Sequence, residues 1–213
     1  CGDKKARFRT VLLDPDLLAS TPPPVLAAAG IDAISHALES YVTSARNPLS
    51  QMYAREAWRL LEQGFAPLVE DPQDAGARGQ MLWGAHLAGA AIESSMLGAA
   101  HACANPLTAR YGVAHGVAVG LMLPAVIRFN GGAAELLYAG LSSGEAREAA
   151  PRLAARVEEL KRAARLPERL RECAVKKEEL PELAHLAATQ WTAKFNPRPL
   201  AEGELLGLYE AAY

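Results

Sequence analysis

The chain has 213 residues, of which 50% are hydrophobic and 22% are charged, and its formal net charge is −2. This length and apolar content suit one large globular domain, or one domain plus part of another, and the lack of a basic excess argues against a nucleic-acid partner. Three widely spaced cysteines do not form a disulfide framework, and no apolar stretch is long enough to cross a bilayer, so we expect a cytoplasmic protein without membrane contact.

The first predicted element is a strand near the N-terminal end. Residues 9–15, RTVLLDP, have a β-branched and aliphatic core that ends at Asp-Pro, which is typical of a strand and the turn after it. The chain opens on Cys1 rather than on methionine. We therefore expect a fragment, or a chain whose N-terminal part is missing.

Helix is expected over the rest of the chain, because alanine is plentiful and aromatic residues make up only 6%. The proline-rich residues 20–30 predict an entry segment, and residues 31–44 carry apolar side chains three or four positions apart. Residues 47–71 predict a long amphipathic helix. Its inward side chains are expected to be Met52, Trp58, Leu61, Phe65 and Leu68.

The second half of the chain also predicts helices. Residues 77–97 are almost wholly apolar and rich in small residues, which favours a central helix packed on all sides, and residues 116–127 predict a buried core helix. Charge density rises after residue 131, so surface helices are expected over 145–166, 181–195 and 200–213. The predicted fold class is mainly α, a bundle of about seven to nine helices judged from usual helix lengths.

The stretch GIDAISHALES, residues 30–40, places Asp32 and His36 four positions apart. On a helix both side chains project from the same face, one turn apart, where a carboxylate and an imidazole can close on one divalent ion. The pair alone is weak evidence, because a helix cap or a salt bridge also explains it. A metal site therefore needs further ligands elsewhere in the chain.

A second stretch, GAAHACANPLTARYGVAHG, residues 98–116, places His101 and His115 among small and apolar residues. An unpaired buried imidazole costs roughly 1–3 kcal/mol, so both need partners from another segment. Asp32 and His36 are the obvious partners. One carboxylate and three imidazoles suit iron, zinc, nickel or cobalt rather than calcium or magnesium.

The two remaining histidines are weaker candidates. His86 lies in an apolar stretch that also carries Glu93, and we expect it to be a hydrogen-bonded core histidine or a neighbour of the site. His185 lies in a charged helix, and we expect it to be a surface residue.

Three longer blocks carry a family resemblance: DPDLLASTPPPVLAAAGIDAISHALESYVTSARNPLS, GAAHACANPLTARYGVAHGVAVGLMLPAVIRFN and FNPRPLAEGELLGLYEAAY. In this order and spacing they resemble the iron-containing (group III) alcohol dehydrogenases over nearly the whole chain. The resemblance implies the helical C-terminal domain of the dehydroquinate synthase-like fold. Residues 20–213 would be the metal-binding catalytic domain. Residues 1–19 would be the tail of a missing N-terminal α/β nucleotide-binding domain, with the strand as its remnant.

The resemblance also implies a site and a reaction. Asp32, His36, His101 and His115 match the family's ligands of a catalytic Fe(II), which zinc replaces in some members. The implied reaction is hydride transfer between a small alcohol or aldehyde and NAD or NADP. We identify no cofactor-binding residue, because the chain has no glycine-rich nucleotide loop after a strand. A homo-oligomer is the family's usual assembly.

The match departs from the family at Asn105, where many members have a histidine that assists proton transfer. Asparagine can donate a hydrogen bond but cannot exchange a proton near neutral pH. We therefore expect any proton relay to run through water, the cofactor or another group. Ala114 and Ala125 likewise replace a proline and a histidine that are common in the family.

Other functions stay open from the sequence alone. Maleylacetate reductases resemble the chain around FNPRPL, and glycerol-dehydrogenase-like enzymes of the same fold use zinc with fewer ligands. A hypothesis of another class is a non-catalytic helical module that keeps a metal but lacks the cofactor domain. Asn105 and the missing nucleotide loop favour that module.

Overall fold

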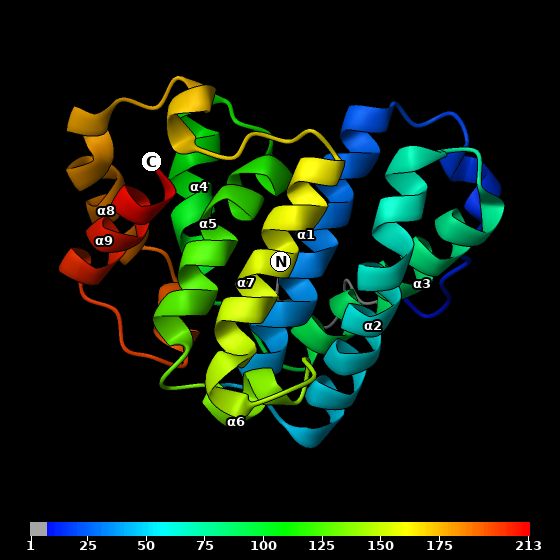
Figure 1. Cartoon of the computed structure of the whole chain (residues 1–213), viewed down its shortest axis with the longest axis horizontal. Coiled ribbons are helices and arrows are strands. Elements are labelled where there is room, and N and C mark those ends of the chain that lie inside the picture. Colours follow the sequence, from blue (N-terminus) through cyan, green and yellow to red (C-terminus); the bar gives the residue numbers. More distant parts are fainter. Residues whose placement is uncertain (1–7) are drawn as a thin grey trace.

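The computed structural model describes residues 8–213, so the part of the predicted tail before Phe8, with Cys1, lies outside the described residues. The described part of the chain is helical (Figure 1). Its α-helices are α1 (Pro23–Val42), α2 (Pro48–Glu70), α3 (Ala75–Glu93), α4 (Ala99–Tyr111), α5 (His115–Asn130), α6 (Glu135–Ala139), α7 (Ala149–Ala163), α8 (Leu180–Ala188) and α9 (Glu202–Ala212). Its 3₁₀ helices are η2 (Pro15–Leu18), η3 (Ala146–Glu148), η4 (Leu170–Cys173), η5 (Lys177–Glu179) and η6 (Ala193–Phe195). The mainly helical fold class is confirmed.

The predicted strand at residues 9–15 is wrong. The chain from Phe8 to Asp14 is irregular, and Pro15 begins η2, which the side chain of Asp14 caps. A strand needs a neighbouring strand to accept its backbone hydrogen bonds, and residues 8–213 contain none. The division into a tail over 1–19 and a domain over 20–213 stays a prediction.

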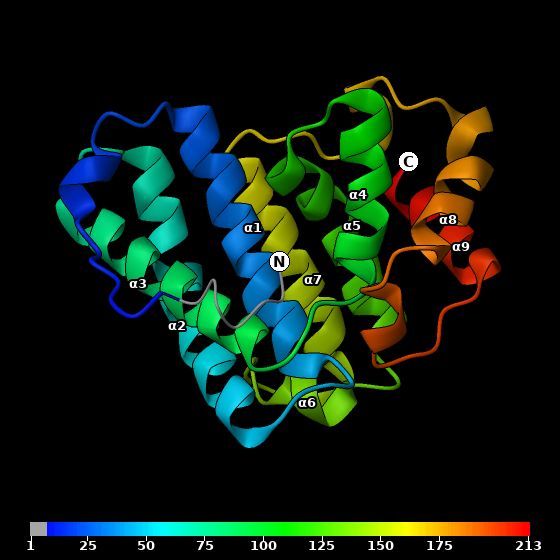
Figure 2. The same ribbon diagram turned by 180° about the vertical axis from the view of Figure 1, so that it is seen from behind.

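Helix α1 lies in the middle of the bundle and joins two groups of helices. It packs on α2 and α3 on one side and on α5 on the other, as both views show (Figures 1 and 2). The second group contains α4, α5, α8 and α9, and α7 packs along α5. The middle of α1 is therefore the part of the chain that both groups enclose.

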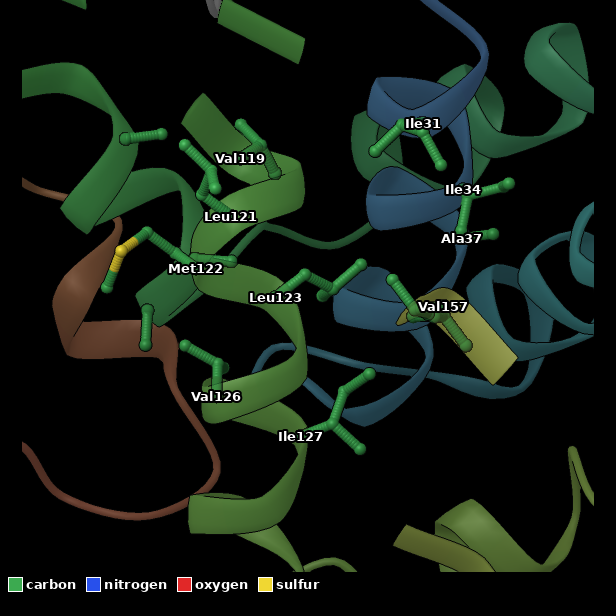
Figure 3. Close-up of a cluster of buried hydrophobic side chains, with 14 of the residues drawn as sticks. Ile31, Ile34, Ala37, Val119, Leu121, Met122, Leu123, Val126, Ile127 and Val157 are labelled. Carbon is green, nitrogen blue, oxygen red and sulfur yellow. The ribbon is translucent and has the colours of Figure 1, made fainter. Parts of the chain in front are cut away.

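The core between these helices is made of buried aliphatic side chains (Figure 3). Ile31 of α1 packs beside Gly120 of α5, and Leu123 of α5 reaches toward α1, with Val157 of α7 close by. Burying such side chains contributes about 1.5–3 kcal/mol each, which makes the α1–α5 contact a major source of stability.

The start of α1 differs from the prediction for residues 20–30. The helix begins within that segment, at Pro23, rather than after it. Proline is well suited to the first turn of a helix, because the missing N–H has no intrahelical partner there. The alanines that follow continue the helix.

Helices α2 and α3 confirm part of the predicted burial. Trp58, Leu61, Phe65 and Leu68 of α2 are buried, but Met52 is 60% exposed. The prediction that residues 77–97 pack on all sides is wrong, because α3 lies at the edge of the bundle and its Trp83 is 48% exposed. The apolar character of α3 comes largely from glycine and alanine, whose small side chains add little apolar surface when exposed.

Helix α5 confirms the predicted buried helix over residues 116–127. It approaches α1 so closely that a Cβ atom at Gly116 would collide with the backbone carbonyl of Ala28. Glycine is therefore required here for close backbone approach. No helix in residues 8–213 has the length and apolarity needed to cross a membrane.

We expect Gly116→Ala to destabilise the fold by about 1–3 kcal/mol, because the added methyl group forces α5 away from α1. Gly203→Ala is the matched control: Gly203 is also the second residue of its helix, α9, and has open space at the Cβ position. Urea unfolding followed by circular dichroism measures both. Equal stability of the two variants would contradict the close α1–α5 contact.

Candidate metal centre

The structure brings Asp32, His36, His101 and His115 together around one carboxylate oxygen. The Nε2 atoms of His36 and His101 each lie 3.4 Å from Asp32 Oδ1, and His115 Nε2 lies 3.8 Å from it. One candidate ligand atom from each of Asp32, His101 and His115 lies within 4.8 Å of the others; His36 is close to Asp32 but is not part of this mutually close group. Ligand atoms at about 2.0–2.2 Å from one ion lie roughly 3–3.5 Å apart, so the two 3.4 Å spacings fit a bound cation, and His115 lies slightly farther out.

Three helices position these side chains. Asp32 and His36 are one turn apart in the middle of α1, His101 is in the first turn of α4, and His115 is the first residue of α5. Gly112 ends α4 with a φ of 65°, the left-handed conformation that glycine adopts without strain. The chain therefore reverses within a few residues, and the rings of His101 and His115 lie 5.4 Å apart.

Two polar atoms of this cluster have no hydrogen-bond partner. Asp32 Oδ1 and His101 Nε2 are both buried and unpaired, although they face each other at 3.4 Å. A buried polar atom without a partner costs about 1–3 kcal/mol. A cation between the two atoms would satisfy both at once. The residues present therefore fit a divalent metal, and their role as ligands stays a prediction.

Glu39 holds His101 from the side away from Asp32. Its Oε2 lies 2.6 Å from His101 Nδ1, and both side chains are buried. When the Nδ1–H of His101 donates to this carboxylate, the Nε2 lone pair is left free toward Asp32. Metal-binding histidines are commonly oriented by a carboxylate in this way.

Glu39 also caps the first turn of α4. Its Oε1 accepts from the backbone N–H of Ala100 at 2.7 Å, and its Oε2 accepts from that of His101 at 3.4 Å. These donors at a helix N-terminus have no intrahelical partner, and the helix dipole favours a negative charge there. A Cβ atom at Gly98 would lie only 3.1 Å from Glu39 Oε1, so glycine leaves the space that the cap needs.

Glu39 was not among the site residues predicted from the sequence. A signal was present, because Glu39 lies seven positions after Asp32 and three after His36 and therefore on the same face of the helix. Asn196 was also missed: its side chain accepts from the N–H of Ala99 and bonds to Asn130. The contact between Asn196 and Ala99 joins residues 97 positions apart, so no local pattern in the sequence predicts it.

The four side chains hold different charges in the metal-free protein. Burial raises the pKa of Asp32, but His101 and the other histidines outweigh burial and hold that pKa below its ordinary value. Burial lowers the pKa of His36 to about 4 and also lowers the pKa of His115. Burial lowers the pKa of His101 as well, but the two nearby carboxylates, of Asp32 and Glu39, outweigh this effect and raise the pKa to about 9. At neutral pH, His101 therefore carries the proton that a cation must displace.

Asn105, the predicted replacement for a proton-relay histidine, lies one turn after His101 on α4. Its amide nitrogen donates to the side chain of Gln190 at 2.9 Å. The amide is therefore held by the turn after α8. No proton-exchanging group stands at this position.

The other two histidines lie apart from the cluster. His86 is half-buried and stacks on the exposed ring of Trp83, so it is not a core residue. His185 is exposed and lies 3.0 Å from Glu202, as expected of a surface histidine.

Comparison with known proteins places the chain in a family. Residues 26–213 match the profile described as Fe-containing alcohol dehydrogenase family, C-terminal. The chain belongs to this family. The relatives described below are a dehydrogenase, an oxidoreductase and a reductase by name.

Three relatives illustrate the similarity. The chain is 31% identical to 1,3-propanediol dehydrogenase of Klebsiella pneumoniae, over 94% of the chain and 54% of that protein. It superposes on the crystal structure of a 1,3-propanediol oxidoreductase with a TM-score of 0.89 and 31% identity, over 94% of the chain and 55% of that structure. The structure of sulfoacetaldehyde reductase of Bifidobacterium kashiwanohense, solved in complex with NAD+, superposes with a TM-score of 0.85 and 25% identity. The match covers 93% of the chain and 53% of that structure. The chain thus spans about half the length of these relatives.

We expect Glu39→Gln to weaken binding of Co2+ by about 10–100-fold, because an amide carries no charge and can donate to His101 Nδ1, which favours the wrong tautomer. Titration calorimetry measures the affinity, and the visible absorption of Co2+ reports the coordination. Glu210→Gln, at an exposed glutamate of α9, is the control. The positioning role of Glu39 is excluded if both variants bind the ion like the unchanged protein.

The affinity for a divalent cation should rise with pH. Because the folded, metal-free protein holds a proton on His101 up to a pKa of about 9, the cation competes with one proton below that pH and with none above it. We expect the affinity to increase about tenfold per unit between pH 7 and 9 and then to level off. Calorimetry in buffers of different ionisation enthalpy also counts the released proton. An affinity that is constant over this range would contradict the assignment of the proton.

Proposed function

We propose that this chain supplies the metal-binding half of the active site of an iron-type alcohol dehydrogenase. The reaction would transfer a hydride between a small alcohol or aldehyde and NAD or NADP. The observation that carries the proposal is the unpaired, buried Asp32 Oδ1, which faces the Nε2 atoms of three histidines. The names of the relatives, which act on 1,3-propanediol or sulfoacetaldehyde, support the alcohol or aldehyde class.

Asp32, His36, His101 and His115 would hold the cation, Fe(II) or zinc. When bound, the cation would act as a Lewis acid on the alcohol or carbonyl oxygen of the substrate. Asp32 contributes the negative charge, while His36 and His115 are neutral at physiological pH because burial lowers the pKa of each. Glu39 keeps His101 in the tautomer that can bind.

The cluster is closed on one side and open on the other. His101 and Glu39 are buried, whereas the side chain of His115 is 38% exposed. Substrate would therefore approach past His115. An ion used only for structure is enclosed by protein ligands, so an open side favours catalysis over the non-catalytic module.

The proton of the alcohol needs an acceptor other than Asn105. The Asn105 amide has no titratable proton near neutral pH and is bonded to Gln190. We infer that water on the open side of His115 carries the proton to solvent. NAD or NADP would bind mainly to an N-terminal nucleotide-binding domain of the kind that the family resemblance implies.

Metal removal tests the proposal on the native protein isolated from its source. We expect chelation to abolish NAD(P)-linked alcohol oxidation and aldehyde reduction, and added Fe(II) or zinc to restore both. The Asp32→Asn variant should lose the bound metal, which elemental analysis measures. Its activity should fall at least about a hundredfold. His185→Ala, at the exposed histidine of α8, is the control.

Activity that survives complete removal of the metal would refute the proposal. Maleylacetate, offered in the same assays, separates the alternative reductase: reduction of maleylacetate without alcohol oxidation would favour that enzyme. A protein that binds the metal but shows neither activity would favour the non-catalytic module.

A further inference from the structure

A second group of charged side chains lines a cavity of about 490 Å3 between α5, α7, the segment after α7 and the end of α9. None of the four residues of the candidate metal centre lines it. On α5 the cavity is lined by Leu121, Pro124, Ala125 and Arg128, whose spacing of three or four positions places them on one face. Gly116, where α5 approaches the backbone of α1, is not among the residues that line it. The cavity is therefore separate from the site proposed above.

Lys161 is the unusual residue of this cavity. It is only 3% exposed, and within residues 8–213 its ammonium group makes no hydrogen bond or ion pair. Its aliphatic stem packs beside Gly120 of α5, at van der Waals distance from a Cβ atom placed there. The stem is therefore buried, while the ammonium nitrogen is not among the enclosed, unpaired polar atoms and reaches the cavity. A charge beside apolar walls with no ion-pair partner favours a counter-ion.

The carboxylates that could neutralise Lys161 are engaged elsewhere. Glu158 forms an ion pair with Arg128 at 2.8 Å, Glu168 lies 3.8 Å from Arg162, and Glu172 accepts from the backbone N–H of Glu168 at 3.2 Å. Burial and the neighbouring Arg169 lower the pKa of Lys161 to about 8, and three carboxylates oppose the shift, those of Glu158, Glu168 and Glu172. At neutral pH, Lys161 is therefore mostly protonated.

The cavity has more positive than negative charge. Four cationic side chains, Arg128, Lys161, Arg162 and Arg169, face two carboxylates. Arg169 is held in place because it donates to the carbonyl oxygen of Ala211 at 3.2 Å. This positive excess favours an anion such as a phosphate monoester, which carries about −1.5 to −2 at pH 7.

We propose that this cavity binds a small organic phosphate, with its phosphate group at Lys161 and the neighbouring arginines. The volume exceeds what a phosphate group alone fills. The apolar side chains of α5 and the alanines at the end of α9 form the remaining wall. That wall would contact the organic part of the ligand. The proposal is independent of the dehydrogenase function.

Titration of the metal-free protein with phenyl phosphate and with inorganic phosphate, in the presence of a chelator, tests the proposal. We expect saturable binding of one molecule per chain, with phenyl phosphate binding more tightly because of the apolar wall. Lys161→Met keeps the length of the side chain and removes the charge, and it should weaken binding at least tenfold. Lys176→Met, at an exposed lysine paired with Glu179, should leave the affinity unchanged.

Circular dichroism and thermal unfolding establish that each variant is folded, and Arg169→Met provides a second variant that should also weaken binding. The proposal is overturned if neither phosphate binds saturably, or if the unchanged chain and the Lys161→Met variant bind with equal affinity. Equal affinity for the two phosphates would overturn the role of the apolar wall and with it the organic ligand.

Discussion

Glu39, on α1, reaches the first turn of α4 with both carboxylate oxygens and so connects the two helices that carry three of the four candidate ligands. One buried carboxylate satisfies backbone donors of a helix that has no side-chain cap of its own, and it orients the ring of His101. The helix dipole and the imidazole both stabilise this negative charge in the interior. The fold and the site therefore depend on the same contact.

Close backbone approach completes the arrangement. Gly98 leaves space for the Glu39 cap, and Gly116 lets α5 approach the backbone of α1 beside Ala28. Gly112 permits the short reversal between α4 and α5. Together they bring the imidazoles of two helix N-termini to Asp32, in the middle of the bundle. The unpaired atoms that remain, Asp32 Oδ1 and His101 Nε2, are what the fold leaves for a cation.

Most helices could be predicted from the sequence, because the periodicity of apolar residues is a local property of the chain. The convergence of the histidines could also be predicted, because a buried imidazole needs a polar partner. Prediction failed at residues 9–15, where the aliphatic pattern of a strand has no neighbouring strand in the described part of the chain, and at Met52, where helical spacing alone did not decide which face is covered. Lys161 was not predicted, since its segment has the charge density of a surface helix. Its burial depends on contacts with α5 that are distant in the sequence.

X-ray absorption at the zinc edge of the zinc-loaded protein tests the central claim most directly, because it identifies the atoms around the ion. The account predicts oxygen and nitrogen neighbours at about 2.0–2.1 Å, with the outer-shell scattering of three imidazole rings. In the Asp32→Asn variant this pattern should be lost. A spectrum of oxygen neighbours without imidazole scattering, or one that the variant leaves unchanged, would contradict a metal centre built from these side chains.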